Sequence, residues 1–412
     1  MKRFLNVITI VAVTLAVVSC ATKQEKTEGS MQYRDLGSTG LKVSEVSIGC
    51  GAFSKMDTAQ SRAFMDVAID SGVNYIDLYD ANPKVRENIG YALSGRRDKM
   101  IIQGHVGSYW NHETQQYERT RDVEKAKKGF QEMLDLLGTD HIEVGMVHII
   151  DDMADWDSIQ NSPFMDYVKS LKSEGKIGHI GVSSHNADVA LAAVKSGLFE
   201  VLMFSLNPAF DRLSADADAW NPESYKSMLP GIDPVRVELY DYCAQHHIAI
   251  TAMKVFASGG GRLLKSETSP FGVAFTPTQC LSYALSKPCV ATAVCGASNI
   301  EELLSDLHYL SATDEEKDYS TLLSGGKSQP DGACTYCNHC SPCPQGIPID
   351  KVNELLDKAD AAGSVSQELQ SAYDALPHHA SECVQCGACE GRCPFDVPIV
   401  ERMKQAAKTF GK

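Results

Sequence analysis

The sequence is poor in positive charge. Its 412 residues include 38 Lys and Arg against 53 Asp and Glu, which gives a formal net charge of −15. Nucleic-acid phosphates are bound by clustered Lys and Arg, so we expect no nucleic-acid partner. The same shortage weakens any general attraction to an anionic membrane surface.

Two sequence patterns are also missing. The apolar run from Phe4 to Val18 is too short for a comfortable membrane-spanning helix, which needs about 20 residues. No Gly-x-Gly-x-x-Gly follows the first expected strand, which counts against an open, doubly wound dinucleotide-binding sheet.

The N-terminus has the features of an export signal. Lys2 and Arg3 precede the apolar run, which ends in Val17-Val18-Ser19-Cys20. This ending resembles the lipobox of bacterial lipoproteins, in which the Cys is acylated. We therefore expect a signal at 1–20, a polar tether at 21–30, and a protein held by Cys20 on a membrane of the cell envelope, periplasmic or outer face. Export without acylation is the alternative.

Short β-branched runs alternate with amphipathic helical stretches through the middle of the chain. Helix Val123–Leu137 is a clear example, with apolar residues at helical spacing. The alternation predicts an α/β fold, a TIM (β/α)₈ barrel over 31–312, followed by a polar linker at 313–330. The eight expected strands are Val46–Cys50, Asn74–Tyr79, Met100–Val106, Ile142–Ile150, Ile177–Ser183, Val201–Leu206, Ile248–Val255 and Val290–Cys295.

Cysteine is concentrated near the C-terminus, where eight of the 14 lie between Cys334 and Cys393. They form Cys-x-x-Cys-x-x-Cys-x-x-Cys-Pro and Cys-x-x-Cys-x-x-Cys-x-x-x-Cys-Pro, and the second run matches bacterial ferredoxins. In two-cluster ferredoxins the fourth ligand of each [4Fe–4S] cluster comes from the other run. We expect two clusters in a mainly helical ferredoxin-type domain at 331–412, and two structural zinc sites are the alternative. The expected ligand sets are Cys334, Cys337, Cys340 with Cys393, and Cys383, Cys386, Cys389 with Cys343.

The barrel resembles the aldo-keto reductases over roughly residues 33–310. The motifs that carry the resemblance are Tyr33-Arg34-Asp35-Leu36-Gly37, Gly40-Leu41-Lys42-Val43-Ser44, Gly72-Val73-Asn74-Tyr75-Ile76-Asp77, Val147-His148, Gly181-Val182-Ser183 and Gly296-Ala297-Ser298-Asn299. A subgroup of this family carries a C-terminal domain with two clusters, and the mature chain resembles that subgroup. The resemblance implies a TIM barrel and carbonyl reduction with a nicotinamide.

The family's catalytic tetrad is only half present. Asp77 and His148 match its Asp and His, but Asn82 stands where the family has its proton-donating Tyr, and His105 where it has Lys. Asn82 cannot donate a proton as a phenol does, whereas His105 titrates near neutrality and can act as an acid or a base. Tyr79 shares a strand face with Asp77 and is a further catalytic candidate.

The nucleotide side of the resemblance is also altered. Glu302 stands near the place where an Arg often grips the 2′-phosphate of NADPH, and a carboxylate there repels that phosphate. NADPH is therefore disfavoured, while NADH, or no nicotinamide at all, stays open. The candidate cofactor-binding residues are Ser183, Ser184, Lys254, Gly296, Ala297, Ser298 and Asn299.

These patterns favour an oxidoreductase that acts on a small carbonyl or hydroxyl compound. Its electrons would pass through the two clusters to or from an unknown donor or acceptor. The alternatives are a non-redox lyase or epimerase that uses the histidine pair, and a membrane-anchored electron-transfer protein with a degenerate barrel.

Overall fold

The structure is a computed structural model of the chain. It describes residues 29–215, 217, 219–257, 261–324, 334, 336, 340–393 and 397–412. The expected signal, which includes Cys20, and residues 21–28 of the expected tether lie outside the described residues. Cys337 also lies outside them. Within the described ranges, no helix is both long and apolar enough to cross a membrane.

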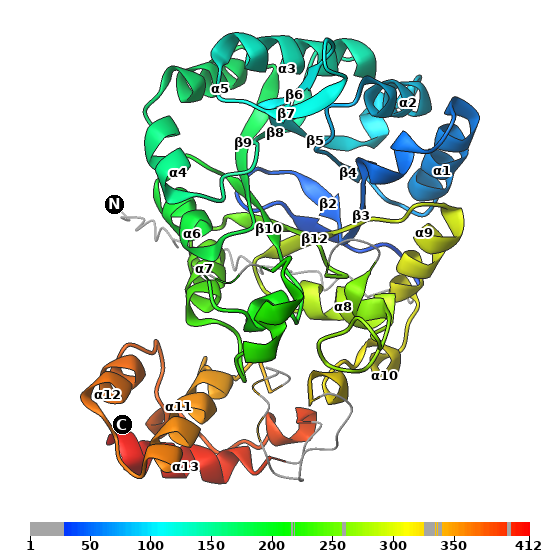
Figure 1. Cartoon of the computed structure of the whole chain (residues 1–412). Coiled ribbons are helices and arrows are strands. Elements are labelled where there is room, and N and C mark those ends of the chain that lie inside the picture. Colours follow the sequence, from blue (N-terminus) through cyan, green and yellow to red (C-terminus); the bar gives the residue numbers. More distant parts are fainter. Residues whose placement is uncertain are drawn as a thin grey trace, which may run out of the picture.

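Eight parallel strands close into a barrel in the order β10-β11-β12-β3-β4-β5-β8-β9 (Figure 1). The eight strands predicted from the sequence all form, and their ends differ by a few residues. Their bounds are β3 Val46–Gly49, β4 Tyr75–Leu78, β5 Ile101–Val106, β8 Ile142–Val147, β9 Ile177–Ser184, β10 Val201–Ser205, β11 Ala249–Met253 and β12 Val290–Cys295.

Helices surround the barrel, and polar caps mark where several of them begin. Asp57 caps α1 and Asp122 caps α3, each by accepting a hydrogen bond from a backbone N–H of the first turn. Helix α3 has the bounds predicted for it. The helices are α1 Thr58–Asp70, α2 Pro83–Leu93, α3 Val123–Leu137, α4 Met153–Ile159, α5 Pro163–Ser173, α6 Ala187–Lys195, α7 Pro234–Gln245, α8 Pro277–Leu285, α9 Ile300–Leu307 and α10 Asp314–Lys317.

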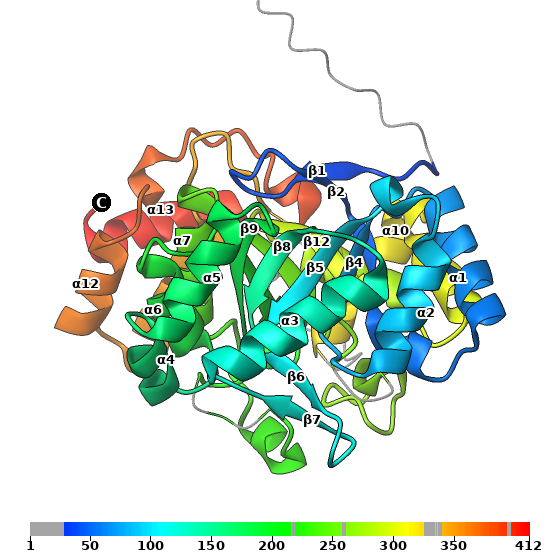
Figure 2. The same cartoon turned by 90° about the horizontal axis from the view of Figure 1, so that it is seen from above.

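Two hairpins lie at opposite ends of the barrel (Figure 2). Strands β1 (Tyr33–Asp35) and β2 (Lys42–Ser44) lie at the amino ends of the barrel strands, where Leu36 and Val43 join the apolar side chains of the barrel interior. Strands β6 (Ser108–Asn111) and β7 (Gln116–Arg119) follow β5 and project beyond the carboxyl ends. The pocket described below lies at this second end.

The segment expected to be a linker packs partly on the barrel. Helix α10 begins at Asp314, the Gln279 side chain donates to the Asp318 carbonyl at 2.9 Å, and the Tyr319 ring lies 5.2 Å from that of Tyr283. The barrel's packing therefore extends to about residue 324.

A second hydrophobic core belongs to the C-terminal part of the chain. Helices α11 (Ile349–Ala362), α12 (Gln367–Asp374) and α13 (Ile399–Phe410) surround it and lie beside the barrel near α7 and α8 (Figure 1). A Cβ added at Gly231, just before α7, would come within 3.7 Å of the Tyr336 ring, so this part of the chain lies directly against the barrel.

Candidate functional site

A cavity of about 710 Å³ lies at the carboxyl ends of the barrel strands. Barrel enzymes carry out their chemistry at this end, and the volume is in the range of small-molecule pockets. Of the predicted site residues, those that line the cavity are Asp77, Tyr79, His105, His148, Ser183, Lys254, Gly296, Ala297 and Ser298. Ser184 and Asn299 are not among its lining residues.

Asp77, His105 and His148 are joined directly by hydrogen bonds. His105 Nε2 lies 3.0 Å from Asp77 Oδ1, and His105 Nδ1 lies 2.7 Å from His148 Nδ1. Gln103 donates to the same Asp77 oxygen at 2.6 Å and is held in turn by the hydroxyl of Tyr75. All five side chains are nearly or fully buried, so their relative positions are firmly set.

The far side of His148 contacts a residue that the sequence did not point to. The hydroxyl of Tyr117, on β7, lies 2.6 Å from His148 Nε2. Burial lowers the pKa of His148 well below its usual value, and the positive charges of His105, Arg121 and Arg119 lower it further. Burial also raises the pKa of Tyr117. At neutral pH His148 is therefore neutral and Tyr117 keeps its proton.

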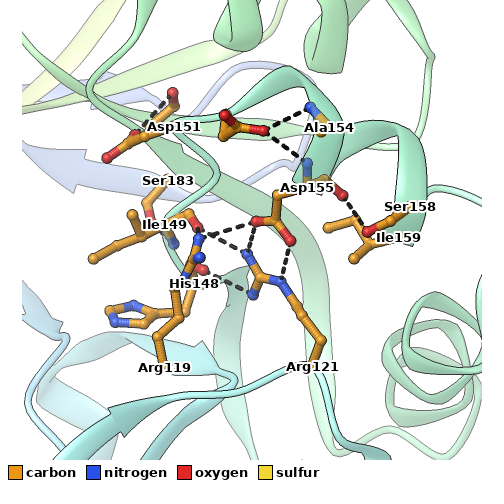
Figure 3. A network of polar contacts seen from close by, with 12 residues as sticks. Arg119, Arg121, His148, Ile149, Asp151, Ala154, Asp155, Ser158, Ile159 and Ser183 are labelled. Carbon is orange, nitrogen blue, oxygen red and sulfur yellow. Dashed lines mark hydrogen bonds and ion pairs between the residues drawn. The ribbon is translucent and has the colours of Figure 1, made fainter.

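An arginine pair holds the backbone after His148 in an unusual conformation (Figure 3). Ile149 has a φ of 43°, which is costly for a β-branched residue. Arg119 and Arg121 both donate to its carbonyl, and both also contact Asp155. On the other side, Ile149 N–H donates to Ser183 Oγ at 2.8 Å. These contacts turn the chain at the end of β8 and fix His148 at the pocket.

The two altered tetrad positions behave differently. The Asn82 side chain caps α2 by accepting from Lys84 N–H at 3.0 Å, so it serves the helix and does not line the cavity. Tyr79 lines the cavity but is 45% exposed, and its hydroxyl contacts neither Asp77 nor His148 in the structure. His105, by contrast, lies between Asp77 and His148 in the buried chain of hydrogen bonds.

Neighbouring serines on β9 face opposite ways. Ser183 reaches the cavity, whereas Ser184 contacts Asp151 and the backbone of Asn186. Successive residues of a strand point to opposite sides, so adjacent serines cannot both face the ligand. His185, which the sequence gave no reason to select, also lines the cavity and pairs with Asp151 at 2.9 Å.

The part of the cavity beside α9 is acidic. Glu302 accepts from Ser298 N–H at 2.7 Å, and Asn299 caps the helix by accepting from Glu302 N–H. Asp306 is buried behind them, and burial raises its pKa to about 7. The backbone donor that would attract a phosphate at this helix start is therefore already used by a carboxylate.

Lys254 supplies a cation to the same cavity. It follows β11 with a φ of 58°, and its ammonium group lies 5.4 Å from the centre of the Trp220 ring. Burial lowers the pKa of Lys254, and the charge of Asp77 acts against this shift. An anionic or carbonyl-bearing substrate would find its positive partner here.

Four cysteines from both runs line one small pocket in the C-terminal domain. Cys343 comes from the first run, and Cys383, Cys386 and Cys389 come from the second. Among the described residues, no three His, Cys, Asp or Glu side chains are close enough together to hold one metal ion. These four cysteines are the set predicted from the sequence for one [4Fe–4S] cluster.

The other described cysteines of the two runs pack against the core of the C-terminal domain. Cys340 is buried, and Cys334 and Cys393 are partly buried beside it. Asn353, which is buried on α11, donates to Cys334 Sγ at 3.5 Å and accepts from Arg402 Nε at 2.8 Å. A side-chain amide is therefore fixed in contact with a candidate ligand sulfur.

Family comparisons agree with this architecture. The model of the aldo/keto reductase family matches residues 45–274, more than half of the chain. The chain belongs to the aldo/keto reductase family. The model of a 4Fe-4S dicluster domain matches residues 333–398, so this aldo/keto reductase carries an iron–sulfur domain after its barrel.

Two relatives of this aldo/keto reductase are named as oxidoreductases. The uncharacterized oxidoreductase YqkF of Bacillus subtilis (strain 168) is 28% identical over 308 residues, which cover 69% of this chain and 94% of YqkF. The oxidoreductase YrpG of the same organism is 32% identical over 167 residues, 37% of this chain and 49% of YrpG. Among solved structures, the holo form of aldo-keto reductase AKR11C1 from Bacillus halodurans is similar to this chain, with a TM-score of 0.57 and 23% identity. The match covers 71% of this chain and 96% of the AKR11C1 chain, and it supports the barrel fold.

Proposed function

We propose that this oxidoreductase acts on a small carbonyl or hydroxyl compound in the barrel pocket and exchanges electrons with it through two [4Fe–4S] clusters. The observation that carries the proposal is that one chain has both a pocket lined by His105 and His148 and a pocket lined by four cysteines. The clusters would supply single electrons. A bound nicotinamide or another two-electron carrier is the element that would join them to barrel chemistry.

The cysteines are assigned to the clusters by the pocket they line. Cys343, Cys383, Cys386 and Cys389 would hold one cluster. The other would be held by Cys334, Cys337, Cys340 and Cys393, of which Cys337 lies outside the described residues. This arrangement places a cysteine of each run on the cluster of the other run.

In the barrel, proton transfer falls to the histidines. Asn82 has no titratable proton and its side chain caps α2, so the usual phenol of the family is absent from that position. The hydrogen-bonded pair of His105 and Asp77 can give a proton to a substrate oxygen or take one from it. Lys254 and Ser183 line the same cavity and would orient the substrate.

The source of electrons is the decisive test. A panel of small carbonyl compounds should be reduced by anaerobic holoprotein when a reduced one-electron donor, such as ferredoxin or a viologen, is supplied. We expect this rate to exceed the rate with NADH, and to disappear when the cluster cysteines are replaced while the barrel stays folded. Full turnover with NADH after loss of the clusters would contradict the proposal. Turnover with no electron donor would instead indicate a lyase or an epimerase that uses the histidine pair.

The nicotinamide specificity gives a second prediction. Glu302 places negative charge where the family binds phosphate, and like charges at contact distance repel each other by several kcal/mol at an effective dielectric constant of about 20. If a nicotinamide binds, NADPH should bind more weakly than NADH by a factor on the order of ten or more.

The measurement is a calorimetric titration of both nucleotides. The variant Glu302→Gln should narrow the difference between them, because it keeps the side-chain oxygen for Ser298 N–H but removes the charge. The variant Glu301→Gln, at the preceding residue of α9, is the matched control. Wild-type protein that binds NADPH as tightly as NADH would contradict the prediction.

A location in the cell envelope, with acylated Cys20 as the anchor, stays a prediction. The mass of the mature N-terminus would test it, since an acylated Cys is heavier than an unmodified one.

A further inference from the structure

The hydrogen bonds of the pocket form one continuous chain from the protein surface to its interior. Tyr117 contacts His148, His148 contacts His105, and His105 contacts Asp77, at 2.6, 2.7 and 3.0 Å. Tyr117 is 43% exposed, while the other three side chains are at most 2% exposed. The inner three line the cavity, so the chain joins the reaction site to solvent.

Each link can carry a proton in a defined direction. The Asp77 carboxylate can only accept, so His105 Nε2–H donates to it. With both rings neutral, His105 Nδ1 then accepts from His148 Nδ1–H, and His148 Nε2 accepts from the Tyr117 hydroxyl. Every donor therefore points toward Asp77, which is the arrangement that passes a proton inward.

We propose that Tyr117, His148 and His105 form a proton path from solvent to the pocket, with Tyr117 as its outer end. The inference rests on the proposed function and adds to it the route by which the reaction obtains its protons. Tyr117 acts through His148 and not on the substrate itself.

The proton balance of the path is simple. Tyr117 passes its hydroxyl proton to His148 Nε2 and takes another from water. His148 passes its Nδ1 proton to His105 Nδ1, and His105 becomes an imidazolium ion paired with Asp77. Reduction of a carbonyl to a hydroxyl uses two electrons, from two equivalents of the one-electron donor, and two protons. His105 passes its Nε2 proton to Asp77, and the Asp77 carboxyl group, which lines the cavity, gives that proton to the substrate. The path then restores the proton from water.

The surroundings of the path keep its two outer groups, Tyr117 and His148, in the protonation states that the path requires. Arg119 and Arg121, which follow Tyr117 on the same stretch of chain, contact the backbone of His148 and Ile149 and the carboxylate of Asp155. Their charges, and that of His185, disfavour a proton on His148, so a proton that reaches this ring passes on to neutral His105. The same two arginines act against the rise in the pKa of Tyr117 that its burial causes.

Tyr117 also places a phenol in contact with His148. The family's phenol position is Asn82, whose side chain caps α2. The Tyr117 hydroxyl, on the β6–β7 hairpin, instead contacts His148, which stands at the position of the family's histidine.

The test compares two tyrosines of the same hairpin. Tyr117→Phe removes only the hydroxyl, while Tyr109→Phe does the same on β6, where the ring lies under Lys125. With saturating one-electron donor, Tyr117→Phe should lower kcat by at least about tenfold and alter its pH profile and solvent isotope effect. Tyr109→Phe should behave like wild type. An unchanged rate and pH profile in Tyr117→Phe would overturn the proposal.

A smaller side chain separates proton transfer from a purely structural role. Tyr117→Ala opens the outer end of the path, so added imidazole should restore part of its lost rate, in proportion to the imidazole concentration. A loss of rate that neither imidazole nor buffer restores would show that Tyr117 only supports the fold, and the proposal would fail.

The path can also be tested apart from turnover. In oxidised holoprotein with ¹⁵N-labelled histidine, the ring proton shared by His148 and His105 should exchange with water more slowly in Tyr117→Phe than in Tyr109→Phe. If no carbonyl compound is reduced but this difference is found, the proposed function fails and the path stands. If the two variants exchange this proton at equal rates while carbonyl compounds are still reduced, the proposed function stands and the path fails.

Discussion

Replacement of His148 by Ala is expected to lower kcat by a factor on the order of 10²–10⁴, the usual effect of losing an acid–base group. His148 is the link between His105 and Tyr117, and it is held from both sides at 2.6–2.7 Å. His105→Ala should fall in the same range, because His105 is the group that faces Asp77. Both variants should retain their iron and sulfide, since neither residue is near the cysteine runs in the sequence.

Two control variants belong to this comparison. Asn82→Ser keeps an oxygen that can cap α2 but removes the amide, and it should lose less than about tenfold. His185→Ala removes another histidine that lines the cavity but pairs with Asp151 outside the chain of hydrogen bonds. A loss in Asn82→Ser as large as in His148→Ala would contradict the assignment of proton transfer to the histidines.

The pH dependence of stability gives an independent measurement on His148. Burial lowers the pKa of His148 in the native state, whereas the unfolded chain binds a proton at this ring near its ordinary pKa of about 6.5. Above that pH neither state is protonated and the free energy of unfolding is unaffected. As the pH falls below it, only the unfolded state gains a proton, so the native state loses stability. His148→Ala should therefore lose less unfolding free energy than wild type between about pH 7 and pH 5.

Local patterns were sufficient to predict the barrel. Runs such as Val290–Cys295 are apolar and β-branched, and they are separated by helices with a regular apolar face, such as Val123–Leu137. Each strand of a parallel barrel is buried on both faces, so it appears in the sequence as a continuous apolar run. The alternation of such runs with helices therefore predicts both the strands and their order. The carboxyl ends of the strands also bring Asp77, His105 and His148 together at one cavity.

Contacts made by inserted segments were not predictable in this way. Tyr117 reaches His148 through the register of the β6–β7 hairpin, which no local rule fixes. Aromatic residues do flank a polar turn there, at Tyr109-Trp110 and Tyr117, and this is a typical hairpin signal. That signal could have located the hairpin, but not the histidine it contacts.

Replacing Cys343 and Cys383 together by Ala is expected to remove one cluster and leave the other whole. The reason is that the two residues come from different runs but line the same pocket. The protein should then hold about four iron and four sulfide per chain, where wild type holds about eight of each. Metal and sulfide analysis of anaerobically purified protein measures this directly, and stoichiometric zinc without sulfide would contradict both assignments.

The matched control is the pair Cys383→Ala and Cys393→Ala, which lie in one run. If each cluster takes its fourth ligand from the other run, this pair damages both clusters and leaves well under four iron per chain. If instead each run holds its own cluster, the two results are exchanged: the pair from one run spares a cluster, and the pair from two runs spares none. Both variants remove two thiols from the same domain, so a general loss of folding would lower the iron content of the two alike. The spectrum of the reduced protein adds a second readout, since a cluster left alone in Cys343→Ala/Cys383→Ala should lose the magnetic coupling that two neighbouring reduced clusters show.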